Sequence, residues 1–404
     1  MDEHPPVEEP LELPVRALRP GMYLYSLGVQ WAFHPFVRNQ FTLDEESIAK
    51  IRQLGLEHVW IDPTRSTVAI PRASLSPRAA AATSGETESP DLRPAIGRGR
   101  DWARRLTQEA RSAVKRMLDN AHAGRAIHLQ DIDAVSGELC AALNDHPDAM
   151  LAFGRIRARD SYTYQHSVNV GVLLMAFAKH LGMPENHVRT LGTAGMVHDI
   201  GKTLIPDGLI TKPGPLTADE YEVVKSHTTR GAELLRGITG IKPLIADIAE
   251  QHHERIDGSG YPHGRTGDEL SIEARMASIV DVYDAVTAIR AYHDGRPPTE
   301  GLRIILGEAG RTFDTTLAQR FVRCIGVYPP GSLVRLTNDH LAVVLEPRAN
   351  QIDRPLVRTI YDIRRARMLD TPRTLDLADP RARHRVVSYE RPEDWAVPPE
   401  LYVY

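Results

Sequence analysis

The feature that most constrains this chain is a concentration of metal-binding side chains in one part of the sequence. Five histidines and two aspartates stand within roughly 115 residues, on segments with helical periodicity. They are His166, His198, Asp199, His227, His252, His253 and Asp281. A lone histidine on an apolar helix is usually a packed core residue. Burying two carboxylates without a cation, however, would carry a large free-energy cost. We therefore expect a metal centre.

The number of donors predicts two divalent ions, with the Asp199 carboxylate bridging them. The expected ligand sets are His166, His198, Asp199 and Asp281 for one ion, and Asp199, His227, His252 and His253 for the other. Nitrogen and oxygen donors without thiolates favour Fe or Mn, with Zn, Co and Ni as alternatives. Two ions about 3.5–4 Å apart activate a bridging water and clamp the attacking and leaving oxygens. This chemistry predicts hydrolysis of a phosphoester.

Two basic residues are candidates for phosphate contacts. Lys202 follows Asp199 by three residues, so a continuing turn places its ammonium near the same phosphate. Arg290 follows Asp281 by nine residues and stands at or past the end of that helix, where its guanidinium can bind a phosphate in a fork. An isolated basic residue is more often a surface charge, but the nearby ligands favour phosphate binding for both.

Composition excludes several other classes of protein. The net charge of −4 gives no general basic field for a nucleic-acid polymer. The two cysteines, Cys140 and Cys324, are far apart, which argues against a disulfide scaffold and fits a reducing compartment. The proline-rich acidic N-terminus is unlike a signal peptide, and the apolar run at 172–178 is too short for a membrane span. We expect a cytoplasmic protein.

Periodicity and composition predict a mainly α fold in which a helical bundle carries a short C-terminal β extension and follows a small α+β domain. The expected segments are a small α+β domain (1–70), a flexible linker (71–100), connecting helices (101–150), the metal-dependent phosphohydrolase domain (151–345) and a C-terminal extension (346–404). The linker assignment rests on its Ala, Ser, Pro, Thr and Gly content. Apolar runs at 333–336 and 341–345 predict a β ribbon.

Three helix signals are specific enough to test. Thr217 and Glu220 form a capping box that predicts a helix continuing through His227 to Leu235. Pro243 is expected to begin another helix. Residues 101–123 predict an amphipathic helix whose arginines form a solvated face. A dimerising or signal-transmitting role for that last helix is the alternative.

Four segments resemble the motifs of the HD-GYP subgroup of the HD phosphohydrolases. They are YTYQHS (162–167), HDIGK (198–202), HHERIDGSGYP (252–262) and DVYDA (281–285). The resemblance covers roughly residues 155–345 and is highly specific. A softer similarity links LRPGM (18–22), with Trp31 and HPF (34–36), to a small domain often fused in front of this one.

The resemblance implies an α-helical bundle with a dimetal centre that hydrolyses cyclic di-GMP, a bacterial second messenger, to pGpG or GMP. It implies the seven ligands above, phosphate contacts from Lys202 and Arg290, and catalytic roles for Asp199 and Lys202. Gly260, Tyr261 and Pro262 would shape the substrate site or touch partners, with GGDEF- or PilZ-type signalling proteins as candidates and a homodimer left open. Tyr162 stands where some relatives have an acidic residue that helps hold a third ion, which favours two ions here.

Two alternatives stay open at this stage. The chain could be a signalling scaffold or receptor that binds cyclic di-GMP or partner proteins with little turnover. It could also hydrolyse another cyclic dinucleotide. Intact ligand positions favour an active phosphodiesterase over the scaffold.

Overall fold

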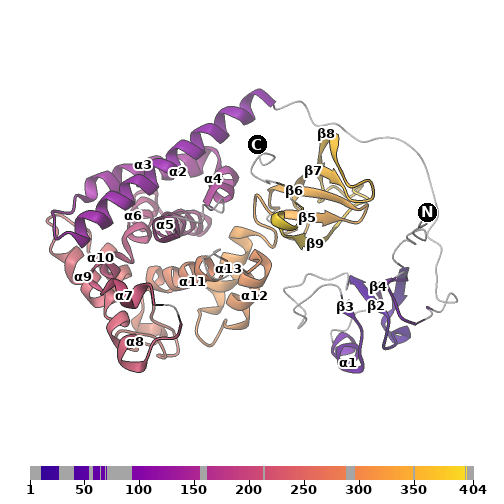
Figure 1. Cartoon of the computed structure of the whole chain (residues 1–404), viewed down its shortest axis with the longest axis horizontal. Coiled ribbons are helices and arrows are strands. Elements are labelled where there is room, and N and C mark those ends of the chain that lie inside the picture. Colours follow the sequence, from indigo (N-terminus) through magenta and orange to yellow (C-terminus); the bar gives the residue numbers. More distant parts are fainter. Residues whose placement is uncertain are drawn as a thin grey trace.

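The structure, a computed structural model, describes residues 11–26, 41–53, 58–63, 65–68, 70, 93–154, 162–212, 214–287, 296–348, 351–395 and 397. Within these ranges the chain forms a small α+β unit, a helical bundle and an antiparallel sheet (Figure 1). The expected fold class is confirmed. Every helix in the described ranges is too short or too polar to cross a membrane.

The small α+β unit is a four-stranded antiparallel sheet with one helix. Its elements are β1 (Leu11–Pro14), η1 (Val15–Ala17), β2 (Tyr23–Ser26), β3 (Phe41–Thr42), α1 (Glu45–Gln53) and β4 (His58–Asp62), with strand order β1-β4-β2-β3. Ile48 and Ile51 of α1 are buried in a core of their own with Leu24 of β2. Trp31 and residues 34–36 lie outside the described residues.

The helical bundle contains the predicted metal ligands. Its elements are α2 (Arg93–His122), α3 (Leu129–Asp145), α4 (Pro147–Gly154), α5 (Tyr162–His180), α6 (Glu185–Val197), η4 (Ile200–Leu204), α7 (Asp207–Ile210), α8 (Ala218–Lys225), α9 (His227–Arg236), α10 (Pro243–Gln251), η5 (Gly267–Glu269), α11 (Ile272–Thr287), α12 (Pro298–Gly307) and α13 (Thr315–Ile325). Helix α5 packs against α2, α6 and α11. The Phe177 ring of α5 meets the Phe321 ring of α13 at 5.3 Å.

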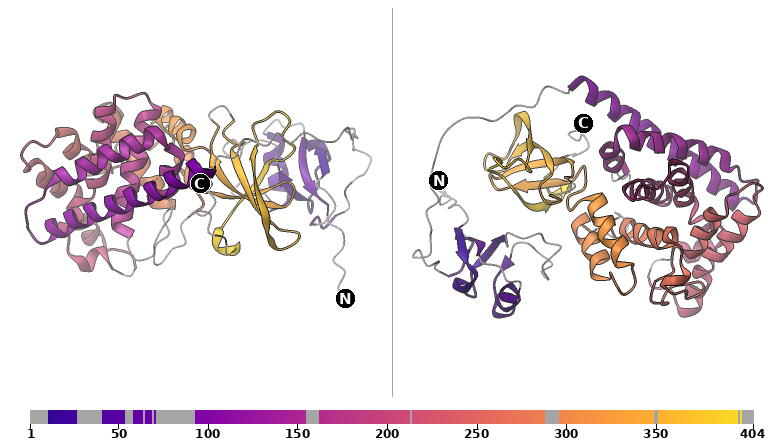
Figure 2. Two further views of the ribbon diagram at one scale, coloured as in Figure 1. Left: turned by 90° about the horizontal axis from the view of Figure 1, so that it is seen from above. Right: turned by 180° about the vertical axis from the view of Figure 1, so that it is seen from behind.

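Helix α2 changes two of the expected segment boundaries. It begins at Arg93, so the last residues of the expected linker 71–100 are helical. Pro94 fits the first turn, where a missing N–H costs nothing. Its apolar side chains, such as Leu106 and Val114, lie in the bundle core. The helices of 101–150 therefore belong to the bundle, where α2 lies along its outside (Figure 2) and buries the described apolar side chains from Leu106 to Ala121 against the other helices.

The capping box is confirmed, but the helix it opens is shorter than expected. The Thr217 side chain accepts a hydrogen bond from the Glu220 N–H, and the Glu220 carboxylate accepts one from the Thr217 N–H. The helix then stops at Lys225, and α9 begins at His227. The single helix expected through Leu235 is wrong. Ser226 donates its hydroxyl to the Val223 carbonyl, a local bond that competes with the regular helical ladder. The start of α10 at Pro243 is confirmed.

The expected β ribbon is the centre of a larger sheet. Its strands are β5 (Leu333–Leu336), β6 (His340–Glu346), β7 (Leu356–Asp362), β8 (Arg367–Asp376) and β9 (Val386–Glu390), in the order β8-β7-β6-β5-β9, and the short α14 (Pro392–Trp395) follows. The boundary expected at 345 does not hold, because β7 and β9 pair with the two ribbon strands. A two-stranded ribbon alone is marginal in water. Leu333 and Leu341 share a core with Ala152 of α4.

Candidate metal centre

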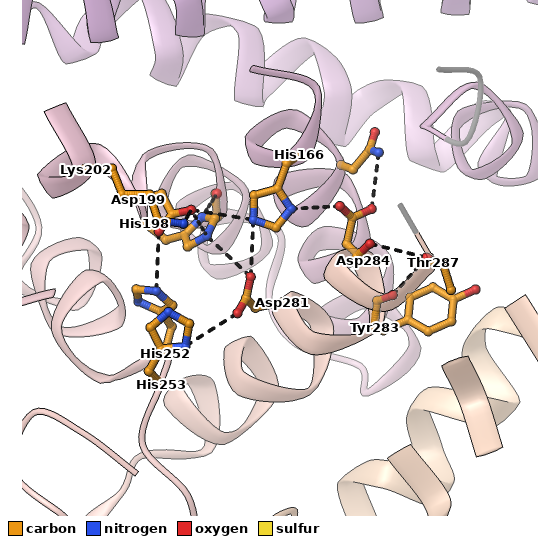
Figure 3. A network of polar contacts seen from close by, with 12 residues as sticks. His166, His198, Asp199, Lys202, His252, His253, Asp281, Tyr283, Asp284 and Thr287 are labelled. Carbon is orange, nitrogen blue, oxygen red and sulfur yellow. Dashed lines mark hydrogen bonds and ion pairs between the residues drawn. The ribbon is translucent and has the colours of Figure 1, made fainter. Parts of the chain in front are cut away.

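The seven predicted ligands come from five helical elements and meet inside the bundle, and Figure 3 labels all of them except His227. His166 lies on α5, His198 and Asp199 follow α6, His227 begins α9, His252 and His253 follow α10, and Asp281 lies on α11. Six of the seven are buried, and His253 is 20% exposed. Sequence positions as far apart as 166 and 281 are therefore brought to one point.

The Asp199 carboxylate lies between two groups of histidines. Its Oδ2 is 3.3 Å from Nε2 of His198 and 3.6 Å from Nε2 of His166. Its Oδ1 is 3.4 Å from Nε2 of His227 and 3.6 Å from Nε2 of His252. One oxygen thus faces each group, which is the arrangement that a bridging ligand requires.

Asp281 also reaches both sides of the centre. Its Oδ1 is 3.2 Å from Nε2 of His166 and 3.7 Å from Nε2 of His198. Its Oδ2 is 3.7 Å from Nδ1 of His253. The donor atoms fall into two sets, each with its members within 4.8 Å of one another, and Asp199 belongs to both. The sets are Asp199, His227, His252 and His253 in one, and His166, His198 and Asp199 in the other.

Backbone carbonyls fix the tautomers of three histidines. Nδ1 of His198 lies 2.7 Å from the Gly195 carbonyl oxygen, and Nδ1 of His227 lies 2.7 Å from that of Val224. Nδ1 of His252 lies 2.9 Å from the Ala249 carbonyl oxygen. A carbonyl only accepts, so each Nδ1 carries a proton, and in the neutral ring Nε2 then presents its lone pair to the centre. These rings are oriented as metal ligands.

Unpartnered buried atoms show that the residues fit a cation. Nε2 of His198, His227 and His252 and Oδ1 of Asp199 are buried without a hydrogen-bond partner. Buried polar atoms are normally satisfied, since an orphaned donor or acceptor costs about 1–3 kcal/mol. Four orphaned atoms that converge on one point, all able to offer a lone pair, match divalent ions held by nitrogen and oxygen donors.

The electrostatics keep most of the donors in their metal-binding states. Burial raises the pKa of Asp199, but the Lys202 ammonium and His198 outweigh it and hold that pKa well below its usual value. Burial lowers the pKa of His252 to about 4 and keeps this ring neutral. Burial also lowers the pKa of His198, but Asp199 and Asp281 outweigh it and raise that pKa to about 10. The two carboxylates therefore favour positive charge at this point, which a cation bound between them would supply.

Of the two predicted phosphate contacts, only Lys202 lies among the residues that the structure describes. The Lys202 ammonium forms an ion pair with Oδ2 of Asp199, and its side chain is 33% exposed. Lys202 therefore joins the buried Asp199 carboxylate to the solvent-exposed surface. Arg290 lies outside the described residues.

The loop with Gly260, Tyr261 and Pro262 lies against the ligands. A Cβ at Gly260 would come within 2.4 Å of the Arg255 backbone nitrogen, so only glycine fits there. The Tyr261 ring is 4.7 Å from the His253 ring and 6.4 Å from the His227 ring. Tyr261 therefore covers one side of the centre.

Two buried carboxylates belong to the site but were not predicted from the sequence. Nδ1 of His166 donates to Asp284 over 2.8 Å. The Glu254 carboxylate accepts from the backbone N–H groups of His263 (2.7 Å) and Arg265 (3.1 Å), beyond the Tyr261 turn. A sequence signal existed for both: each is an acidic residue within one helical turn of a predicted ligand, inside a quoted motif.

The sequence matches known families and, over most of its length, a named relative. The family model HD domain matches residues 141–317, and the model Domain of unknown function (DUF3391) matches residues 11–132. The protein named Cyclic di-GMP phosphodiesterase PA4108 from Pseudomonas aeruginosa is 35% identical over 385 residues, which cover 95% of this chain and 92% of that protein.

Two further relatives match a smaller part of the chain. A cyclic di-GMP phosphodiesterase from Thermotoga maritima is 39% identical over 41% of this chain and 45% of its own length. The 3'3'-cGAMP-specific phosphodiesterase 1 of Vibrio cholerae is 36% identical over 40% of this chain and 37% of its own length. The chain thus spans less than half of these two relatives.

Proposed function

The chain belongs to the family of HD-domain cyclic di-GMP phosphodiesterases, and from this premise we propose that it hydrolyses cyclic di-GMP at the centre described above. The observation that carries the proposal is Asp199, whose two oxygens face separate histidine groups, with unpartnered Nε2 atoms on both sides. The products would be pGpG, GMP or both, and the role would lie in bacterial signalling.

We assign the divalent ions to the seven side chains predicted from the sequence. These are His166, His198, Asp199, His227, His252, His253 and Asp281, with Fe or Mn as the proposed metal because thiolates are absent from the set. When bound, two adjacent divalent ions supply a water of lowered pKa and polarise the phosphodiester.

The protein side chains position the phosphate and its surroundings. The partly exposed Lys202 ammonium, next to Asp199, would contact a non-bridging phosphate oxygen and balance its charge. Arg290 is proposed as a second phosphate contact. Tyr261, stacked beside His253, would exclude water from one side of the reacting group.

The test is elemental analysis of anaerobically purified protein, combined with chromatography of the products. Wild type should hold about two ions per chain and convert cyclic di-GMP to pGpG or GMP. Asp199→Ala should lose metal and reduce kcat/KM by more than about 100-fold, because it removes a ligand of both ions. Asp145→Ala changes an exposed aspartate at the end of α3 and serves as the matched control.

Two outcomes would contradict the proposal. A metal-loaded wild type that binds cyclic di-GMP but gives no product would support the receptor alternative. An Asp199→Ala variant that keeps both metal and turnover would show that the reaction takes place elsewhere.

For partners, we keep GGDEF- or PilZ-type signalling proteins and a homodimer as proposals. Asp257 and Ser259 leave one side of the Tyr261 loop exposed for contact with another protein. Cross-linking through a cysteine placed at Ser259 tests the first proposal, and sedimentation of the full chain tests the second.

A further inference from the structure

Three side chains next to the metal centre, one exposed and two partly buried, form a surface that the metal-ligand assignments leave unused. We call Tyr221, Lys225 and Tyr261 the tyrosine–lysine platform. Tyr221 is 47% exposed in the middle of α8. Its ring lies 6.3 Å from the Tyr261 ring at an interplanar angle of 77°. The Lys225 ammonium lies 5.4 Å from the centre of the Tyr221 ring and 5.7 Å from that of Tyr261.

The platform continues outward from the metal centre. Tyr261 stacks beside His253 at 4.7 Å and an interplanar angle of 34°, and the Tyr221 ring adjoins Tyr261 in turn. A ligand whose phosphate reaches the centre would therefore extend its next group over Tyr221 and Lys225. In a cyclic dinucleotide, that next group is a ribose carrying a base.

We propose that the tyrosine–lysine platform binds a guanine base of the substrate, stacked on Tyr221 with the Lys225 ammonium at the O6 and N7 edge. This inference rests on the proposed function, because it takes a phosphate at the metal centre as its starting point. An exposed aromatic ring stacks any base, because every base has a π face.

Lys225 gives the platform a preference for guanine. Guanine presents two acceptors, O6 and N7, on this edge, whereas adenine presents one acceptor and an amino donor. An ammonium only donates, so it matches guanine and opposes the adenine amino group. Lys225 also pairs with Glu222, a 68% exposed carboxylate, at 2.5 Å. That surface pair is weak and leaves further N–H donors of the ammonium for the base.

The test is calorimetric titration of the full-length protein, supplied with Mn²⁺, with GMP and separately with AMP. Lys225→Met should reduce the preference for GMP over AMP by about tenfold, since one base-edge contact is lost. Tyr221→Ala should weaken the binding of both nucleotides by about tenfold without changing the ratio of their affinities, and Tyr221→Phe should restore binding. Lys50→Met removes a lysine of a similar surface ion pair on α1. It should change neither the affinity for GMP nor the affinity for AMP. Melting temperatures establish that the variants are folded.

Each opposite result would overturn the inference. If Lys225→Met weakened the binding of GMP and of AMP equally, the ammonium would hold a phosphate instead of a base. Unchanged binding in Tyr221→Ala, or no binding of either nucleotide to wild type, would reject the platform. Turnover of cyclic di-GMP is measured separately. A wild type that prefers GMP but forms no product would reject the hydrolysis and leave the platform in place.

Discussion

Nδ1 of His166 donates a hydrogen bond to the Asp284 carboxylate over 2.8 Å and thereby joins α5 to α11 inside the bundle (Figure 3). Asn169 donates to the other oxygen of Asp284 over 3.3 Å. Both partners of the first bond are buried. The carboxylate fixes the ring so that Nε2 of His166 faces Asp281 and Asp199, and it increases the basicity of that nitrogen.

The first prediction concerns this orienting carboxylate. Asp284→Ala should weaken Mn²⁺ affinity by about 10–100-fold, because His166 would lose its fixed orientation. Asp284→Asn keeps one acceptor oxygen and should lie between wild type and Asp284→Ala. Metal titration of the purified variants measures the effect, with thermal melts as the control for folding. Unchanged metal affinity in folded Asp284→Ala protein would mean that the carboxylate only packs the helices together.

The seven candidate ligands were predictable because their chemistry is visible one residue at a time. The adjacent histidines His252 and His253, the pair His198-Asp199, and the Asp281 carboxylate within an otherwise apolar helical pattern are unusual in any sequence. Asp284 was not predicted, although it stands three residues after Asp281 in the same motif, because that position alone does not distinguish a carboxylate that orients a ligand from a surface charge. Only the packing of α5 against α11 distinguishes the two.

The second prediction concerns the loop behind Tyr261. Both oxygens of Glu254 accept backbone N–H groups in a buried setting, where the residue is 1% exposed. Glu254→Gln turns one acceptor into a donor that faces an N–H, a mismatch of about 1–3 kcal/mol. We expect a lower melting temperature and a KM for cyclic di-GMP that rises more than kcat falls, because Tyr261 would shift.

Glu269→Gln is the matched control for the loop. Glu269 also accepts from a backbone N–H, that of Thr266 at 2.8 Å, but its carboxylate is exposed, so water can replace the bond. It should leave KM and the melting temperature nearly unchanged. Equal behaviour of the two variants would show that Glu254 does not position the loop.

The third prediction tests the close approach of η4 to α9. A Cβ at Gly201 would come within 1.9 Å of the His227 carbonyl oxygen and 2.7 Å of the Gly231 nitrogen. Gly201→Ala should therefore separate Lys202 from the His227 side of the centre and destabilise the fold by about 2–3 kcal/mol. In Gly208→Ala the added methyl meets nothing within 4 Å, so this variant is the control. Denaturation and metal titration compare the two, and equal stability would exclude the tight contact.

The sequence predicted the helix starts that a local signal determines. It did not predict the helix ends and strand pairings that depend on long-range contacts. The capping box at Thr217 and the helix start at Pro243 needed only neighbouring residues. The end of α8 at Lys225 and the pairing of β7 and β9 around the central ribbon did not show in the hydrophobic pattern. Composition likewise placed residues 93–100 in a linker, although α2 continues through them.

The fourth prediction concerns the pH dependence of stability at Asp148 on α4. Burial and the nearby Glu346 carboxylate raise the pKa of Asp148 to about 7, and Arg348 offsets only part of this. Arg348 is itself bound by Asp376 at 2.8 Å. The folded chain therefore holds a proton on Asp148 that the unfolded chain releases near pH 4.

A raised folded-state pKa means stability that is fully present below pH 4 and is lost as the pH rises from there through 7. The loss should be about 2 kcal/mol, less than for a fully buried group, because this side chain is only half-buried. Asp148→Asn keeps the shape without the charge, so its unfolding free energy should exceed that of wild type above pH 7 and match it near pH 4. Urea denaturation across this range measures the difference. If the difference in unfolding free energy between the two proteins stayed constant with pH, Asp148 would be ionised in the folded protein across the whole range.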